Sequence, residues 1–555
     1  SVITAAGNNK NSEIEVSGNT VNISGGTVSS IVGGYGGNFG STGKSMVIEN
    51  NKIILGGNSV VAGTIIGGYF RLPNFTPDAN FNSLVKNNTI TVTGNADLEN
   101  ADLYGSYISG INTVTEESGN NLIIDNWKKQ NINSINNFNK IEFKNINWEN
   151  KGIVVNVLNN GEKTSSSLKD TQIDLRGSTT LAGGSSLKSN DYMYFIKSNN
   201  GSLETNKDNI LVNKNGDNDN IFTAGVAFKG TGKVEVEDDG SIKYTITDVQ
   251  NNEQTNIVPV NHSLAAAFII SGNDLVVDGL NAMEQDQLFG VKTFAIVEGN
   301  DSSYDVAEDI KVNGWNGLFG IGNIKEYENG NFSYAAFYEN GIANYRTFNR
   351  FMNEIIRGDG SIIYNGGGIA GRYRNDNGFY AEGSLRAGLL KNQLKNMFKD
   401  GNGNVYGYNT ESQYYALHLG TGKIFDIKED KNLDLYLRYY HTYNEGDNFI
   451  VAGDRFDVDS ITSDKVRVGT RYNINNTENL STYIGLAFEY EFNGKADVSV
   501  NGQNLPGEKL QGSSSYAEIG FVQQNNSPWS FEGRARGYAG VREGISGLLR
   551  VTYSF

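Results

Sequence analysis

Histidine is the residue on which most acid–base and nucleophilic chemistry would depend, and this chain of 555 residues has only three. They are His262, His418 and His441, so none lies within residues 1–256. A Ser–His–Asp triad or a histidine-bound zinc confined to those residues therefore has no histidine to use. The chain has no cysteine either, which removes disulfides and thiolate ligands. We expect no enzyme activity, no cofactor and no metal.

Three kinds of short motif, in four segments, resemble ligand sites. Thr42-Gly-Lys-Ser45 is similar to the end of a P-loop, yet Asn38 stands where its first glycine belongs. Residues 400–404 and 453–459 are rich in Asp and Asn oxygens, as calcium sites are, but neither completes an EF-hand loop. Arg357-Gly-Asp359 matches the integrin-binding tripeptide, and we place it in a long loop outside the cell. Ordinary turn chemistry is the favoured interpretation of all three, with a bound ion or integrin as the alternative.

Composition favours strands joined by turns. The chain has 68 glycines but only 5 prolines, together with 29 tyrosines and 27 phenylalanines. Glycine supplies the positive φ values that turns need, and the aromatic content argues against disorder. The formal net charge of -16 excludes a nucleic-acid binder that works by neutralising phosphates.

The amino-terminal part repeats a two-strand phrase. Asn19-Thr-Val-Asn-Ile-Ser-Gly25 recurs from Asn51 and from Asn88, and each copy is followed by a phrase that ends in tyrosine. Such repeats are typical of a stacked solenoid, so we predict a parallel β-helix over residues 1–190, with an antiparallel sandwich as the alternative. The tyrosines would lie at one place on successive turns, either as a ligand contact or as a stack that seals the core: Tyr35, Tyr69 and Tyr107.

Two shorter segments follow the repeats. Residues 191–256 keep strand patterns without the tyrosine phrase, and we interpret them as the cap of the solenoid. Asn261 is the predicted N-cap of a helix over residues 262–287, within a linker of residues 257–290. Its carboxylates forbid contact with lipid, so such a helix crosses a membrane only inside a polar pore: Asp274, Asp278, Glu284 and Asp286.

Residues 291–555 alternate between apolar and polar positions in twelve segments of membrane-strand length. They begin near Lys292, Val312, Asn331, Ser361, Phe379, Ser412, Asn432, Asp464, Leu480, Ser514, Trp529 and Glu543. The odd connections are mostly long, at 299–311, 342–360, 394–411, 445–463 and 493–513, whereas the even ones are mostly tight turns. This asymmetry is how bacterial membrane barrels are built. We therefore predict a 12-stranded transmembrane antiparallel β-barrel.

The two faces of the predicted strands differ in the same way. Leu435, Leu437, Val466, Val468 and Leu549 fall on the apolar face that would meet lipid. Arginines occupy alternate positions on the other face, where a packed apolar core could not accept them. We expect them in the lumen, beside the acidic helix: Arg438, Arg467, Arg471, Arg534 and Arg536.

The final strand carries a recognition pattern. Leu549, Val551, Tyr553 and Phe555 share one face, and Phe555 is the last residue of this sequence. This pattern resembles the signal by which insertion machinery recognises bacterial outer-membrane proteins. With Gly378–Gly388 and Tyr483–Phe492, it resembles the translocator β-domain of a monomeric (type Va) autotransporter of Gram-negative bacteria.

The resemblance implies an all-β protein in the outer membrane with its passenger exposed at the cell surface. Its partners would be outer-membrane lipid, the barrel insertion machinery and, through the passenger, an unknown host protein or glycan. We expect a monomer whose passenger acts as an adhesin in virulence. An enzymatic passenger and a porin-like barrel with a soluble extension remain as alternatives. Some members cut their linker at an Asn-Asn bond, but the helix here contains no such pair, so we expect the passenger to stay attached.

Overall fold

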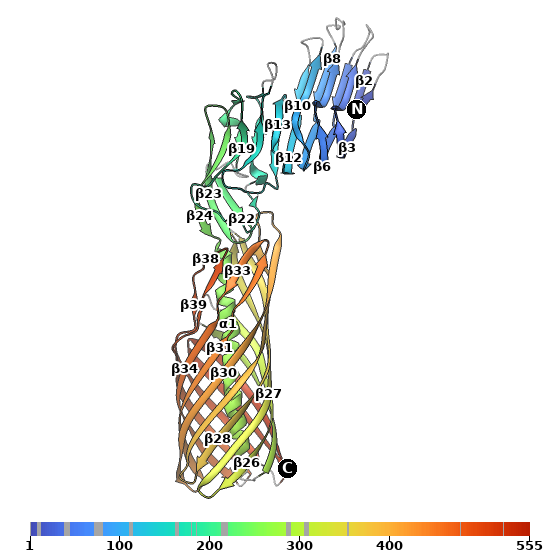
Figure 1. Ribbon diagram of the computed structural model, residues 1–555. Coiled ribbons are helices and arrows are strands. Elements are labelled where there is room, and N and C mark those ends of the chain that lie inside the picture. The colour runs from blue at the N-terminus through green and yellow to red at the C-terminus, as the bar shows by residue number, and fades with distance from the viewer. Residues whose placement is uncertain are drawn as a thin grey trace. The chain divides into compact units, whose positions relative to one another are not determined.

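The chain divides into two compact units, residues 1–250 with 400–402, and residues 251–399 with 403–555. The first is a solenoid and the second is a barrel around a helix (Figure 1). The computed structural model describes residues 2–7, 13–37, 45–71, 81–109, 115–160, 166–178, 180–184, 186–212, 220–284, 290–304, 310–351, 354–477, 479–524 and 527–555. The P-loop-like residues 42–44 and the predicted helix end at 285–287 lie outside the described residues.

Three stacked sheets form the solenoid, and neighbouring strands along each stack are parallel. This confirms the predicted β-helix and excludes the antiparallel sandwich for these repeats. One sheet contains β1 (Val2–Gly7), β4 (Ser30–Gly37), β7 (Thr64–Arg71), β10 (Leu98–Ser109), β13 (Asn131–Asn136), β15 (Ile153–Val157) and β19 (Tyr192–Ser198). The second contains β2 (Glu13–Ser17), β5 (Ser45–Glu49), β8 (Asn82–Lys86) and β11 (Glu116–Ser118). The third contains β3 (Thr20–Val28), β6 (Lys52–Val61), β9 (Thr89–Gly94), β12 (Asn121–Trp127), β14 (Lys140–Lys144), β17 (Gln172–Asp174) and β21 (Ile210–Leu211).

A ladder of asparagines runs through one corner of this stack. The backbone N–H and Nδ2 of Asn51 both donate to Oδ1 of Asn88, at 3.2 and 2.9 Å. Asn88 donates to Asn120 in the same way, and Asn51 receives the same two bonds from Asn19. The ladder asparagines Asn51, Asn88 and Asn120 are fully buried. Because these amides bond to residues on neighbouring turns, the ladder satisfies polar groups that would otherwise be costly to bury.

The residue before each ladder asparagine makes the corner. Asn50 and Asn87 have φ values of 56° and 55°, and Gly18 and Gly119 occupy the equivalent places with φ values of 70° and 64°. Asn and Gly are the residues that tolerate this left-handed conformation best. The repeated Asn-Asn and Gly-Asn pairs therefore combine a corner residue with a ladder residue.

The parallel stack gives way to antiparallel pairing near its carboxy-terminal end. β24 (Ile242–Asn251) pairs antiparallel with β19, and β23 (Phe228–Val236) pairs antiparallel with β22 (Asn220–Ala224). The short elements here are β16 (Ser167–Leu168), β18 (Thr180–Leu181), β20 (Glu204–Thr205) and the 3-10 turns η1 (Arg176–Ser178) and η2 (Lys207–Asn209). With these antiparallel strands, the solenoid no longer presents at this end the edge on which a further parallel turn would stack.

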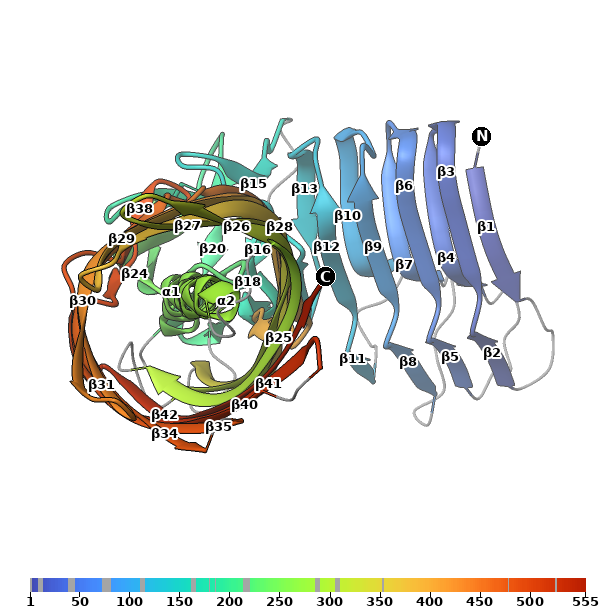
Figure 2. The ribbon, with the colours of Figure 1, turned by 90° about the horizontal axis from the view of Figure 1, so that it is seen from below.

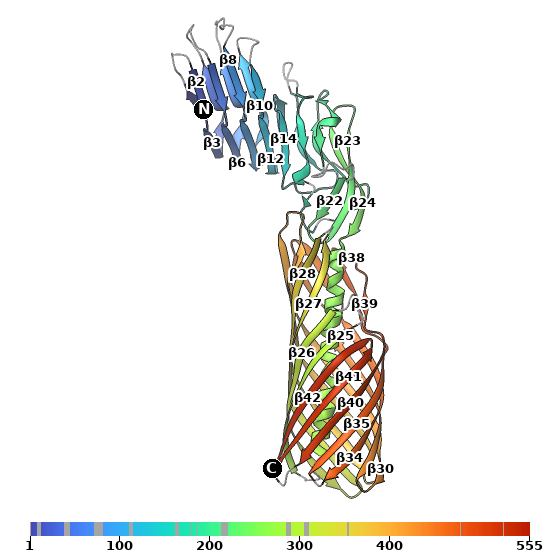
Figure 3. The same ribbon diagram turned by 180° about the vertical axis from the view of Figure 1, so that it is seen from behind.

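Twelve strands close the barrel, and every neighbouring pair is antiparallel. They are β25 (Gly290–Tyr304), β26 (Ile310–Tyr327), β27 (Gly330–Phe351), β28 (Glu354–Asn375), β29 (Phe379–Lys399), β30 (Val405–Lys428), β31 (Lys431–Asn444), β34 (Ile461–Thr477), β35 (Leu480–Glu491), β40 (Gly512–Gln524), β41 (Trp529–Gly540) and β42 (Arg542–Ser554). Figure 3 shows β40, β41 and β42 in succession beside the carboxy terminus. The predicted number of strands is confirmed.

Three of the predicted long connections are mostly strand. β27 and β28 stay paired as far as Phe351 and Glu354, so Arg357-Gly-Asp359 lies in β28 and its placement in a loop is wrong. Alternation continues through these residues, because Tyr345 and Thr347 point inward while Arg346 is exposed. Two connections do remain long, and they contain β32 (Asp447–Val451), β33 (Asp454–Val458), β36 (Lys495–Ala496), β37 (Val498–Val500), β38 (Gln503–Asn504) and β39 (Glu508–Lys509).

A broken helix lies inside the barrel, as the view along the barrel shows (Figure 2). It consists of the 3-10 turn η3 (Glu253–Asn256), α1 (Ile257–Ser271) and α2 (Asn273–Glu284). The stretch Glu253–Glu284 is long and apolar enough to cross a membrane, and its most apolar part is wholly buried inside the barrel. The predicted cap at Asn261 is wrong, since α1 begins at Ile257 with Asn256 at its cap position. Pro259 lies in the first turn, where a helix tolerates proline.

Removing a rung of the asparagine ladder should destabilise the solenoid. Asn88→Ala leaves the Nδ2 of Asn51, the Oδ1 of Asn120 and the carbonyl of Ile48 without their bonds to the side chain. We expect a loss of about 2–4 kcal/mol in the free energy of unfolding, since buried unpaired polar groups cost about 1–3 kcal/mol each. Urea unfolding of the full chain followed by proteolysis of the solenoid measures it. Asn95→Ala, which removes an exposed amide pair with Asn58, is the control and should change little.

A charge placed on the outer face of the barrel should have a depth-dependent cost. Leu437 is 47% exposed on β31, with Arg438 beside it buried in the lumen. Leu437→Arg should cost about 2–4 kcal/mol near the midplane of a bilayer, whereas Leu433→Arg near the turn should cost about 0–1 kcal/mol. Unfolding titrations in lipid vesicles measure both variants. Equal costs at the two positions would contradict a lipid-facing band on this strand.

Candidate functional site: the helix inside the barrel

Two carboxylates on α2 lie between arginines of the opposite wall. Asp274 accepts hydrogen bonds from Arg467 on β34 at 2.5 Å and from Arg536 on β41 at 2.6 Å. Asp278, one helical turn later, receives a two-pronged bond from Arg534 at 2.7 and 2.9 Å. Spacing of four residues places both carboxylates on one face of the helix. All five side chains are at most 5% exposed.

The other two predicted lumenal arginines pair with the wall instead of the helix. Arg438 donates to Glu382 at 2.7 Å, and Arg471 donates to Glu518 at 2.9 Å. Glu518 also accepts a hydrogen bond from Arg536, so the wall carboxylates link one arginine to the next. The structure thus places all five predicted arginines inside the barrel, but only three of them contact α2 through the bonds described above.

Glu284, the last residue of α2, forms a separate contact near the turn end of the barrel. Its carboxylate lies 3.2 Å from Arg374 and 3.6 Å from Arg372 of β28, and Ser333 donates to it at 3.2 Å. Arg372 also donates to the side chain of Asn281 at 2.9 Å. The carboxy-terminal end of the helix is therefore anchored on β27 and β28.

Cations of the wall also bind the helix backbone. Arg386 donates to the carbonyl of Ile269 at 2.7 Å, and Lys292 donates to the carbonyl of Met283 at 2.8 Å. Both carbonyls belong to the last turn of their helix, where the helix dipole favours a positive charge, and Ile269 also accepts the N–H of Gly272 at 3.0 Å. Arg550 donates to the carbonyl of Asp278 at 2.9 Å. The break between α1 and α2 is thus held from the wall.

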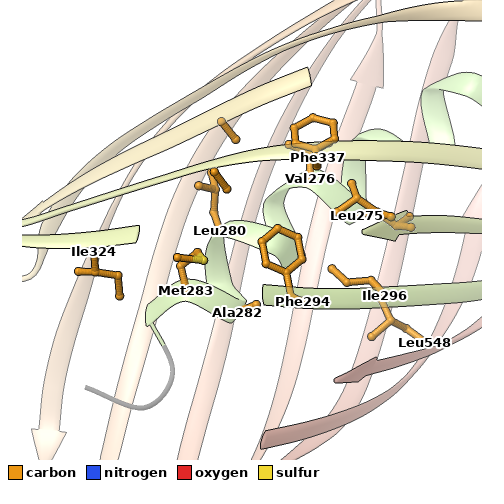
Figure 4. Packing of buried hydrophobic residues seen from close by; sticks show 13 residues of the cluster. Leu275, Val276, Leu280, Ala282, Met283, Phe294, Ile296, Ile324, Phe337 and Leu548 are labelled. Carbon is orange, nitrogen blue, oxygen red and sulfur yellow. The ribbon is translucent and has the colours of Figure 1, made fainter. Parts of the chain in front are cut away.

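An apolar surface lies opposite the acidic face of α2, and sequence reasoning missed it. Leu275, Val276, Leu280, Ala282 and Met283 pack against inward side chains of β25–β28 and β42 (Figure 4). The wall residues are Phe294, Ile296, Leu318, Ile324, Ala335, Phe337, Ala370 and Leu548. The available signal was the run of apolar residues at inward positions of the first three strands, where the pattern of a polar lumen fails. The helix is therefore amphipathic, and its two faces match two different walls.

At the other end the helix lies among the long connections. Gln254 exchanges two hydrogen bonds of 2.9 Å with the backbone of Lys399, at the end of β29. Asn261 donates to Tyr408 of β30 at 2.6 Å and accepts a bond from Tyr345. The helix therefore begins at the mouth that carries the long connections and ends at the mouth that carries the turns.

The remaining predicted sites are placed as follows. Tyr35, Tyr69 and Tyr107 are paired in register on neighbouring strands, and their ring centroids are 5.2 and 5.4 Å apart. Tyr107 is 37% exposed and the other two are half-buried, so the stack lies on the surface of the sheet. Leu549 and Phe555 are exposed on the outer face of the barrel, where Val551 and Tyr553 are half-buried. Within the described residues no group of three or more His, Cys, Asp or Glu side chains could hold a metal ion.

Neutralising Asp274 should loosen the helix. Asp274→Asn leaves Arg467 and Arg536 buried with one fewer counter-charge, which costs about 3 kcal/mol by analogy with other buried pairs. We expect a lower melting temperature for the barrel and a higher ion conductance of the full chain in a planar bilayer. Asp301→Asn, on the exposed face of β25, is the matched control. A conductance equal to that of the unmodified chain would mean that these ion pairs do not hold the helix in place.

Comparison with known proteins gives a family match for the barrel. The sequence model of the autotransporter β-domain family matches residues 300–536. The β-domain of the Bordetella autotransporter BrkA is similar over 48% of this chain and 100% of its own, at 15% identity and a TM-score of 0.40. The transport unit of AIDA-I from Escherichia coli is similar over 55% and 100%, at 14% identity and a TM-score of 0.42. The translocator domain of NalP from Neisseria meningitidis covers 53% of this chain and 98% of its own, at 17% identity and a TM-score of 0.40.

No curated protein matches the chain. The family match lies wholly within the twelve strands, and the parallel-strand solenoid stands where such proteins carry a passenger. The carboxy-terminal barrel is therefore an autotransporter β-domain, by the family match over residues 300–536.

Proposed function

We propose that this chain is a monomeric (type Va) autotransporter that displays its β-helical passenger on the cell surface. The observation that carries the proposal is the direction of the helix. Gln254 is bonded at the mouth with the long connections, and Glu284 is bonded near the turns. Long loops of bacterial barrels face the outside of the cell. Residues that precede the helix would then leave the barrel toward the outside.

Protease accessibility on intact cells tests this orientation. We expect external protease to remove the solenoid from cells that express the full chain and to leave the barrel in the membrane. A solenoid that stays intact until the cells are opened would overturn the proposal. The filled lumen favours an autotransporter over the alternative of an open porin-like barrel, because α2 contacts both walls.

We propose further that the passenger is an adhesin for a host protein or glycan and stays attached to the barrel. Residues 1–256 contain no histidine, which disfavours the alternative of a hydrolytic passenger. Tyrosine is a strong interface residue, since it buries a large rigid surface and keeps a hydroxyl for bonding. Asn281 is followed by Ala282, and Asn251-Asn252 precedes α1, so the helix offers no Asn-Asn bond for release.

The tyrosine stack should separate adhesion from stability. Cells that display the full chain with Tyr35→Ala, Tyr69→Ala and Tyr107→Ala should adhere less to host cells, while the melting curve of the passenger stays unchanged. The matched variants Tyr35→Phe, Tyr69→Phe and Tyr107→Phe keep the ring stack and remove only the hydroxyls. A collapsed melting curve for the alanine variant would show that the stack is structural, and unchanged adhesion would exclude it as the contact.

A further inference from the structure

The outer face of β27, β28 and β29 changes from apolar to basic on the way to the mouth with the long connections. Tyr338, Ile363 and Leu389 are exposed apolar or aromatic side chains, at 52%, 37% and 45%. Level with Ile363 and beyond it toward that mouth, four cations are exposed on the same face, next to Phe348 and Ile355, which are exposed at 63% and 71%. This basic patch consists of Arg346 on β27, Arg357 on β28, and Lys391 and Lys395 on β29.

The height of the basic patch matches the level of lipid headgroups. Arg346 lies 16 residues beyond Gly330, the turn end of β27. A strand tilted by roughly 40° rises about 40 Å over that length. The hydrocarbon core of a bilayer is about 30 Å thick, and the headgroups extend it to about 40–45 Å. A membrane that covers the apolar band therefore brings its headgroups level with the basic patch.

The carboxylates nearby do not neutralise the patch. Asp359 is the register partner of both Arg346 and Lys395, and it lies 3.5 Å from Arg346 and 3.4 Å from Arg357. Lys391 lies 3.0 Å from Glu411. Such exposed pairs are weak and are screened by salt, so the cations stay available to another anion. Four cations against two carboxylates leave two positive charges in a chain whose net charge is -16.

The same level of the barrel is acidic elsewhere. Outward carboxylates near this mouth include Asp301 on β25, Asp464 on β34 and Glu543 on β42, whereas Lys311 on β26, beside β27, is a further exposed cation. A general attraction between barrel and membrane surface would not gather cations on the neighbouring strands β26–β29. The basic patch is therefore a local feature of the wall, with an apolar surface directly below it.

We propose that the basic patch binds the phosphate groups of a membrane lipid whose acyl chains lie on the apolar band below. Arg346 and Lys395 flank Asp359 in register and would take one phosphate between them, while Arg357 and Lys391 extend the patch along the strands. The occupant is an amphiphile with a phosphorylated headgroup, since both halves of the surface must be matched. With the orientation proposed above, that lipid belongs to the outer leaflet.

Binding of lipid A to the purified full chain in neutral detergent tests the proposal. The probes are bisphosphorylated lipid A and a dephosphorylated lipid A with the same acyl chains. The patch variant is Arg346→Gln with Lys395→Gln. Its matched control is Lys325→Gln with Lys423→Gln, which removes two exposed cations from the outer face at the turn end. The melting temperature of each variant verifies that the barrel is intact.

We expect the patch variant to bind the phosphorylated probe roughly thirtyfold more weakly, as two lost headgroup contacts imply, and the control to bind it normally. Asp359→Asn should tighten binding, because it frees Arg346 and Arg357. Equal affinity for the two probes, equal losses in patch and control, or full displacement by inorganic phosphate would overturn the proposal. Detergent micelles impose no orientation, so this result is independent of whether the passenger is displayed outside the cell.

Discussion

The buried ion pairs between α2 and the arginines of β34 and β41 are the interaction on which the barrel depends. Charges in a low-dielectric interior are costly unless they are paired and fully hydrogen-bonded. Asp274 and Asp278 provide the counter-charges for Arg467, Arg534 and Arg536, and the arginines in turn make it permissible to bury two carboxylates. Neither the helix nor this part of the wall is electrostatically complete without the other.

The second face of α2 determines how the helix is rotated inside the barrel. The acidic face fits only the wall with arginines, and the apolar face fits only the wall formed by β25–β28 and β42. Rotation of the helix would place carboxylates against Phe294 and Phe337. It would also leave Arg467 and Arg536 with only their wall partners, Glu489 and Glu518. The wall cations that bind the carbonyls of Ile269 and Met283 also fix the position of the helix along the barrel axis, because these carbonyls lie near the ends of α1 and α2. The helix is thereby defined both in rotation and along the barrel axis.

The solenoid solves the same problem without charges. It has no disulfide to use, and its corner asparagines satisfy one another from turn to turn in the interior. A ladder of this kind depends on every turn having the same residue at the same place, which makes the stack cooperative between neighbours. Amide pairs inside the solenoid and ion pairs inside the barrel are thus two ways of satisfying polar groups that are buried.

Local periodicity in the sequence predicted most of the architecture. Alternation with period two is a property of each strand by itself, so the twelve barrel strands and the inward arginines were recognisable from residues such as Arg467 and Arg534. The continued pairing of β27 and β28 around Arg357 was not recognisable from the sequence, because a strand whose outward residues are charged resembles a loop. The apolar wall around Phe294 and the ladder through Asn120 were also missed, because both arise from contacts between segments far apart in the chain. The cap at Asn261 was wrong because a good capping residue can equally serve inside a helix as a hydrogen-bond partner for tyrosines.

The most direct test of the account is an engineered cross-link between the helix and the wall. The chain has no cysteine, and the Nδ2 of Asn316 on β26 donates to the Oγ of Ser271 at 3.0 Å, near the break in the helix. Ser271→Cys with Asn316→Cys should form a disulfide in the membrane-inserted full chain, seen as a mobility shift that a reductant reverses. Ser271→Cys with Gly317→Cys, whose second cysteine faces outward, should form none. Absence of the first disulfide, or equal formation of both, would contradict a helix held inside the barrel by its wall.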